Sequence, residues 1–161
     1  MGKTLVVYYS ATGQTERVAK IAAEKLGADM FELQPATPYS EADFDWTDLE
    51  SRVSKEHNDE SLRDIDLVQE TPENWDEYDT VLIGCPIWYG IFAWPVNRFM
   101  KINSFADKTV VPFCVSHSSP LGDSDKLLHE MTSSGDWKDG YRFAMDPSEE
   151  EIDSWLKGLG L

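Results

Sequence analysis

The chain has 161 residues and a formal net charge of −16, with 14 Lys and Arg against 30 Asp and Glu. This length suits one domain over residues 1–161, and 41% hydrophobic residues are enough to build its core. So acidic a chain is a poor partner for nucleic acid or an anionic membrane surface. It has no apolar run of membrane-spanning length, its start at residues 1–5 is not typical of a signal peptide, and it has only two cysteines. We therefore expect a cytoplasmic protein.

Strands and helices alternate along the chain. The first strand is expected over residues 4–9, a continuous run of β-branched and aromatic residues that is typical of a strand covered on both faces. Apolar residues at helical spacing follow and predict a helix that ends at Gly27. Further strands are expected over residues 30–33, 80–85, 109–115 and 141–145. Pro112 lacks an N–H donor and should mark an irregularity in the fourth strand.

The remaining helices are indicated by capping residues and apolar spacing. Thr47 and Glu50 predict a capping box at the start of a helix, and Ser148 with Glu151 predicts a second one before the last helix. Pro95 suits the first turn of another helix. Leu127, Leu128 and Met131 predict one more, whereas residues 58–77 show little periodicity and are expected to be a loop.

Five strands joined by helical crossovers predict an α/β fold with a doubly wound five-stranded parallel sheet and helices on both faces. In such sheets ligands bind beyond the carboxyl ends of the strands, where the winding reverses. The segments that follow Tyr9, Cys85 and Val115 are therefore the candidate site.

The first of these segments, residues 10–15, combines three hydroxyl side chains with a flexible Gly13 before a helix. Free N–H groups and the helix dipole at such a position favour a phosphate. The segment has no Lys or Arg and lacks the Gly-Lys-Ser/Thr ending of a nucleotide triphosphatase loop. It would hold a single phosphate by neutral donors, although an ordinary strand-to-helix turn with a threonine cap explains the same residues.

The second segment, residues 86–90, contains the adjacent aromatic residues Trp88 and Tyr89, followed by Gly90. Two aromatic side chains at the end of a strand are able to wall a flat ring, and the glycine lets the backbone approach it closely. Packing in the core is the other interpretation of the same pair.

The third segment, residues 116–122, is rich in small polar donors that suit the edge of a heterocycle. The same residues would also suit a turn that caps the next helix. His117 lies within it, and we interpret this histidine either as a surface residue or as a hydrogen-bonding group of the site.

The other reactive side chains predict no further chemistry. The three histidines have no metal-ligand spacing, so no metal site is expected. No Cys stands five residues before an Arg, as in a phosphatase, and no Ser-His-Asp arrangement can be argued from spacing, so no catalytic residue is assigned. Cys85 and Cys114 each lie at the end of a predicted strand and are interpreted as buried thiols, with a regulatory disulfide as the alternative.

Negative charge is concentrated between Glu41 and Asp79, where 15 acids and 3 bases give −12 of the total charge and leave −4 for the rest of the chain. A solvated face that keeps the protein in solution is one interpretation. A docking field for basic partners, or one that tunes a bound redox group, is the other.

Together these segments resemble the flavodoxin family over nearly the whole chain. The Ser-x-Thr-Gly-x-Thr pattern at residues 10–15 resembles the flavodoxin phosphate loop. Pro-Ile-Trp-Tyr-Gly at residues 86–90 is similar to the flavin-side loop of a bacterial subgroup, in which a second Trp is commoner than Tyr89. Residues 112–122 and 39–46 are similar to other segments of that subgroup, although Ser-Ser-Pro at residues 118–120 departs from its Gly-Ser-Gly pattern.

The resemblance implies strand order 2-1-3-4-5 and non-covalently bound FMN. The cofactor-binding residues that we predict are Ser10, Ala11, Thr12, Gly13, Gln14, Thr15, Pro86, Ile87, Trp88, Tyr89, Gly90, Ser116, His117, Ser118, Leu121 and Gly122. The first hypothesis for the function is an electron carrier between redox partner proteins with basic docking surfaces. The alternatives are an NAD(P)H-dependent FMN reductase of quinones or flavins, and a flavin-free acidic binding module.

Overall fold

A computed structural model describes residues 3–161. Met1 and Gly2, which belong to the stretch 1–5 that we expected not to be a signal peptide, lie outside the described residues. The central sheet is parallel, in the order β2-β1-β3-β6, and both β7 and β8 pair with β6 on the outer side. The predicted α/β class and strand order are confirmed. The strands are β1 (Lys3–Tyr8), β2 (Asp29–Glu32), β3 (Tyr78–Cys85), β6 (Thr109–Val115), β7 (Asp136–Trp137) and β8 (Tyr141–Phe143).

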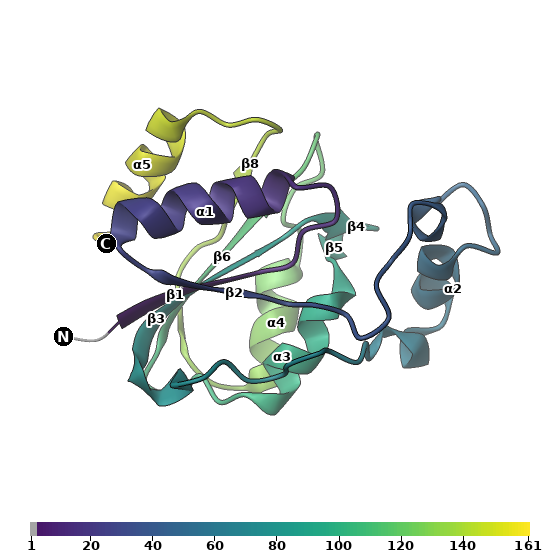
Figure 1. The fold of residues 1–161 in the computed structure, drawn as a ribbon, viewed down its shortest axis with the longest axis horizontal. Helices are drawn as coiled ribbons and strands as arrows, with labels where there is room; N and C mark the ends of the chain where they lie inside the picture. Colours follow the sequence, from purple (N-terminus) through teal and green to yellow (C-terminus); the bar gives the residue numbers. More distant parts are fainter. Residues whose placement is uncertain (1–2) are drawn as a thin grey trace.

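The helices cover both faces of this sheet (Figure 1), with α1 and α5 on one side and α3 and α4 on the other. Side chains alternate along each strand, so Leu5 and Val7 of β1 belong to the α3/α4 core and Val6 to the α1/α5 core. The helices are α1 (Gln14–Leu26), α2 (Arg52–Asn58), α3 (Asn97–Ile102), α4 (Ser124–Thr132) and α5 (Glu149–Gly158). No helix within residues 3–161 has the length and apolar character needed to cross a membrane.

The fifth position of the sheet is occupied by two short strands instead of one. Strand β7 pairs with Thr109 and Val110, and β8 pairs with the last three residues of β6. Between them the partner strand carries Pro112, and Gly140 packs so closely that a Cβ there would lie 3.1 Å from the carbonyl oxygen of Pro112. The irregularity expected at this proline therefore appears as a break in the neighbouring strand, while β6 keeps an unshifted register with β3.

Most predicted helix ends agree with the structure. Gly27 closes α1 in the left-handed conformation, with φ of 62°. The Ser148 side chain accepts a hydrogen bond from the Glu151 N–H at the start of α5. Pro95 lies in a short 3₁₀ turn, η4 (Trp94–Val96), that leads into α3.

The expected helix start at Thr47 is wrong. Helix α2 begins at Arg52, and its cap is Ser51, whose hydroxyl accepts from the Ser54 N–H. The hydroxyl of Thr47 instead bonds Asp45. Local hydrogen bonds of this kind compete with helix formation and delay the helix by one turn.

Residues 39–68 form a lobe that projects from the sheet beyond the carboxyl ends of its strands (Figure 1), and we call it the α2 lobe. Besides α2 it contains two 3₁₀ turns, η1 (Ala42–Phe44) and η2 (Glu60–Arg63). A further turn, η3 (Trp75–Glu77), leads into β3. A small antiparallel hairpin, β4 (Ile87–Trp88) with β5 (Ile91–Phe92), follows β3.

Candidate functional site

The three segments predicted from the sequence meet around one cavity of about 600 Å³. It lies where β1, β3 and β6 end, because parallel strands present their carboxyl ends at the same edge of the sheet. Eleven of the sixteen predicted residues line it. They are Ala11, Thr12, Gln14 and Thr15 from the first segment, Pro86, Ile87, Trp88 and Tyr89 from the second, and Ser116, His117 and Ser118 from the third.

The other five predicted residues, Ser10, Gly13, Gly90, Leu121 and Gly122, do not line this cavity but shape the segments that do. The Ser10 hydroxyl oxygen accepts from the N–H groups of Gly13 at 3.1 Å and Glu16 at 3.2 Å, and so fixes the turn into α1. Gly122, with φ of +58°, lies against the second segment: a Cβ added to it would be 2.8 Å from the carbonyl oxygen of Gly90. The two glycines therefore let these segments touch.

The first segment presents unused hydrogen-bond donors to the cavity. The N–H groups of Gln14 and Thr15 have no acceptor in residues 3–161, as expected for the first turn of a helix. Thr15 is only 2% exposed and lines the cavity, and its hydroxyl has no hydrogen-bond partner among these residues. Gln14 is fixed by two hydrogen bonds with Asp146, one accepted from its backbone N–H and one donated to its carboxylate. This end of the cavity suits an anion held by neutral donors.

Trp88 forms an aromatic wall at the other end. Four rings surround it, with centroid distances of 5.6 Å to Tyr9, 5.2 Å to Tyr39, 5.7 Å to Phe44 and 5.1 Å to Trp94. Most of these contacts are edge-to-face, the arrangement that the charge distribution of aromatic rings favours. The indole is thereby held in one orientation at the cavity.

A buried carboxylate, Glu56 of α2, holds two of these rings. It accepts hydrogen bonds from the Tyr39 hydroxyl at 2.5 Å and the Trp94 Nε1 at 2.9 Å, and it pairs with Arg52 at 3.1 Å. The Arg52 guanidinium also lies 3.6 Å from the centre of the Tyr39 ring. Burial and then the hydrogen bond to Glu56 raise the pKa of Tyr39, so its hydroxyl remains a donor. Helix α2 therefore fixes the orientation of the rings that pack around Trp88.

Tyr89 is held by the same helix. Its ring stacks on His57 with a centroid distance of 3.8 Å and an interplanar angle of 12°. Its hydroxyl lies 3.3 Å from the Ser54 hydroxyl. Tyr89 has a φ of 52°, which is uncommon for a bulky residue and is maintained here by these contacts. The second aromatic residue of the pair thus faces the α2 lobe as well as the cavity.

Six lining residues lie outside the predicted set: Phe44, Trp46, Val53, Val115, Ser119 and Met145. Val115 precedes the third segment and Ser119 lies within it. Their position in the sequence was the only feature that could have predicted them as lining residues. Phe44 and Trp46 belong to the stretch 39–46 that resembles a flavodoxin subgroup, which was the signal that could have assigned them. Trp46 is 70% exposed, so it lies at the rim.

Cys85 and Cys114 are both buried free thiols that occupy the same register in β3 and β6. Burial raises the pKa of Cys114 to about 11 and raises that of Cys85 further, so both are protonated at neutral pH. The interpretation as buried thiols is confirmed.

The fold and this three-sided cavity define a nucleotide-binding protein of the doubly wound class. A family model described as Flavodoxin matches residues 3–159, and the chain therefore belongs to the flavodoxin family. No curated protein matches the chain.

Solved structures agree with this assignment. A putative flavoprotein from Bacteroides uniformis is 40% identical, covers 97% of this chain and 98% of its own, and superposes with a TM-score of 0.88. A putative flavoprotein from Bacteroides eggerthii is 37% identical, and the match covers 100% of this chain and 99% of that one, with a TM-score of 0.88. A Lactobacillus acidophilus flavoprotein in complex with FMN shares the fold, at 21% identity, coverage of 97% and 99%, and a TM-score of 0.68.

Membership in this family makes FMN the cofactor of the chain, and the residues present fit it. The free donors of Gln14 and Thr15 suit the phosphate, which carries the charge of the nucleotide. The Trp88 wall suits the flat ring system. These two ends belong to one cavity, which is the arrangement that a mononucleotide with a charged end and an aromatic end requires.

Proposed function

We propose that this chain is a cytoplasmic electron carrier that binds FMN non-covalently and exchanges electrons with redox proteins through their basic docking surfaces. Bound FMN supplies one- and two-electron chemistry. The chain itself holds the phosphate through neutral donors, orients the ring with Trp88 and excludes water with the aromatic residues around it. The two free thiols support a reducing compartment.

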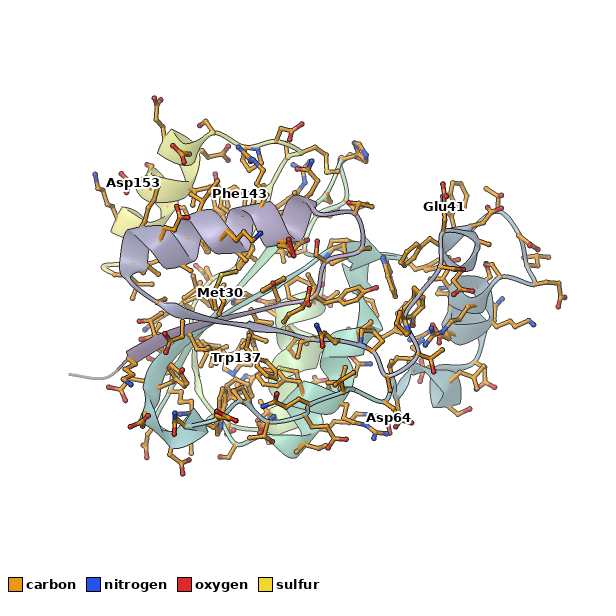
Figure 2. The ribbon with its side chains drawn as sticks, in the orientation of Figure 1. Met30, Glu41, Asp64, Trp137, Phe143 and Asp153 are labelled. Atoms are coloured by element: carbon orange, nitrogen blue, oxygen red, sulfur yellow. The ribbon has the colours of Figure 1, made fainter. Side chains whose placement is uncertain are left out.

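The observation that carries this proposal is the rim of the cavity formed by residues 41–50 of the α2 lobe. These ten residues contain five acids and no Lys or Arg. Among them Trp46 is 70% exposed and Leu49 74% exposed, and Trp46 also lines the cavity. Glu41 lies at the top of the lobe in the view of Figure 2. Apolar anchors within a charged rim are typical of protein interfaces, and the acids select a basic partner.

The lining of the site favours a carrier over an NAD(P)H-dependent reductase. No Lys or Arg lines the cavity described above, nor the neighbouring cavity bordered by Tyr9, Gln34 and Tyr39, among the residues that the structure covers. A dinucleotide has several phosphate charges, and sites for such ligands commonly supply cationic partners. Neither lining supplies such a partner within residues 3–161.

The test uses the holoprotein, reduced by light under anaerobic conditions and mixed in a stopped-flow instrument with cytochrome c, a basic haem protein. Neutralising Asp45, Asp48 and Glu50 (D45N, D48N, E50Q) should slow electron transfer several-fold at low ionic strength, because the attraction that accelerates encounter is lost. High salt should remove the difference.

The matched control neutralises three acids of α5 (E149Q, E150Q, D153N). Asp153 lies at the end of the molecule away from the α2 lobe (Figure 2). The control should transfer electrons at the wild-type rate. Equal rates for all three proteins would reject the docking proposal. Rapid reduction by NADPH alone with turnover of a quinone would instead establish the reductase, and a colourless protein that does not bind added FMN would establish the binding module.

A further inference from the structure

Arg142 of β8 holds the third segment in place from outside the cavity. Its Nε donates to the Ser116 hydroxyl oxygen at 3.0 Å, and one Nη donates to the backbone carbonyl oxygens of Ser116 at 3.1 Å and His117 at 2.7 Å. The Ser116 hydroxyl in turn donates to the carbonyl oxygen of Ser119 at 2.6 Å. A continuous chain of hydrogen bonds thus runs from the sheet into the segment that lines the cavity.

The third segment has little other support. Its first residue, Ser116, donates its N–H to the carbonyl oxygen of Phe143 at 3.0 Å, but the exposed residues 117–120 make no backbone-to-backbone hydrogen bond within the described range 3–161. This stretch also contains the Ser-Ser-Pro sequence that departs from the family pattern. An exposed loop without backbone hydrogen bonds depends on side chains for its conformation.

The charge of Arg142 is not neutralised by a carboxylate. Arg52, Arg63 and Arg98 each pair with a Glu or Asp, whereas no carboxylate of residues 3–161 lies within 4.0 Å of the Arg142 guanidinium. Arg17 is also without a carboxylate partner in this range, but it bonds the Pro147 carbonyl oxygen and not a residue that lines the cavity. In a chain with 30 acids, an unpaired arginine bonded to two cavity-lining residues is a distinct feature. A positive charge beside the cavity favours electron density on a ligand within it.

We propose that Arg142 is a positioning residue for the ring end of the cofactor: its planar fork of donors holds Ser116 and His117 at the cavity, and its charge raises the reduction potential of the bound flavin. This inference rests on the assignment of FMN to the cavity. The third segment belongs to the ring end because it lies against the segment that carries Trp88: a Cβ on Gly122 would be 2.8 Å from the Gly90 carbonyl oxygen. Arginine contributes a planar fork of donors and a positive charge. A lysine at this position would keep the charge and lose the fork, because an ammonium is a point charge.

The test measures the binding of FMN and of riboflavin to apoprotein by flavin fluorescence, for wild type, Arg142→Gln and Arg142→Lys. Riboflavin has the ring system without the phosphate. We expect Arg142→Gln to weaken both ligands equally, by roughly tenfold, because the loss is at the ring end. Arg142→Lys should weaken both by a smaller factor. Lys126→Gln removes one charge from an exposed residue of α4 and should bind both as wild type does.

The reduction potential of bound FMN separates charge from structure. We expect a lower potential in Arg142→Gln and a wild-type potential in Arg142→Lys, a rescue that a purely structural role would not produce. Circular dichroism reports whether each variant folds, and Arg142→Lys still tests the fork if Arg142→Gln does not fold. Wild-type affinity for both ligands in the folded variants, or loss of FMN affinity alone, would overturn the proposal. Failure of the wild type to bind FMN would instead reject the cofactor assignment.

Discussion

The two ends of the cavity are built in different ways. The phosphate end comes from one continuous segment, in which β1, the turn at Ser10 and the first turn of α1 follow each other in the sequence. The ring end is assembled from distant parts of the chain, because Trp88 is held by Tyr9 and by residues of the α2 lobe, which Glu56 joins. Local hydrogen bonds therefore determine most of the first end, where the two bonds between Gln14 and Asp146 join distant residues, and tertiary packing determines the second.

The largest effect should follow from removing the carboxylate behind the ring end. Glu56→Ala leaves Tyr39, Trp94 and Arg52 without their shared partner in a buried position. We expect the free energy of unfolding, measured in urea, to fall by about 3–5 kcal/mol. Glu60→Ala removes an exposed acid of the same lobe and should change it by less than about 0.5 kcal/mol. Similar losses in the two variants would show that the network does not support this end.

Alkaline pH should lower the free energy of unfolding through Cys114, a buried residue of β6. Burial raises the pKa of Cys114 from 9.0 to about 11, so the unfolded chain loses this proton first as the pH rises. The stability that the thiol contributes is complete below pH 9 and is lost between pH 9 and about 11, amounting to about 3 kcal/mol. Urea unfolding across this range should show a shallower decline for Cys114→Ala than for wild type, and parallel declines would contradict the assignment.

The contact between the second and third segments should be sensitive to one methyl group. Gly122→Ala combines a φ of +58° with a Cβ 2.8 Å from the Gly90 carbonyl oxygen, and we expect a loss of about 1–3 kcal/mol in stability together with weaker FMN binding. Gly27→Ala has a similar φ of +62° in open space. Gly27→Ala therefore measures the effect of backbone strain without a steric clash. Equal FMN affinity in Gly122→Ala and Gly27→Ala would mean that FMN binding does not require the contact between the second and third segments.

The smallest effect is expected at the phosphate end, where several donors share one anion. Thr15→Val keeps the shape of the buried side chain and removes its free hydroxyl. Binding of FMN should weaken by about 1–2 kcal/mol, while riboflavin binding stays unchanged because it lacks the phosphate. Calorimetric titration of apoprotein with both ligands measures this difference. Equal losses for the two ligands would assign Thr15 to the ring end.

The same contrast explains what the sequence predicted. The first strand, the turn at Ser10 and the end of α1 at Gly27 follow from local patterns, and the structure has all three. The helix expected at Thr47 was wrong, since Thr47 bonds Asp45 and Ser51 caps the helix instead. Asp45 lies outside the Thr47–Glu50 pattern that predicted the helix, so that pattern alone does not reveal the competing bond.

Residues of the ring end were only partly predictable for a related reason. Trp88 and Tyr89 stand out as adjacent aromatics at the end of a strand, but nothing in their own segment indicates Glu56 or Trp46. Through the fold of the α2 lobe, Trp46 reaches the cavity and Glu56 supports the aromatic wall. Likewise Arg142 was expected only as part of a strand, and its role depends on the neighbouring β6. Contacts between distant segments leave no periodic pattern for a single sequence to reveal.

The divided strand at the edge of the sheet has a consequence for behaviour at high protein concentration. A long, uninterrupted border would expose a row of unpaired amides on which another polypeptide could extend the sheet. Here one border is broken into β7 and β8, and the opposite border is the four-residue β2, which carries Asp29 and Glu32. Neither side provides a template for self-association by strand addition, so the divided strand also protects the molecule against aggregation.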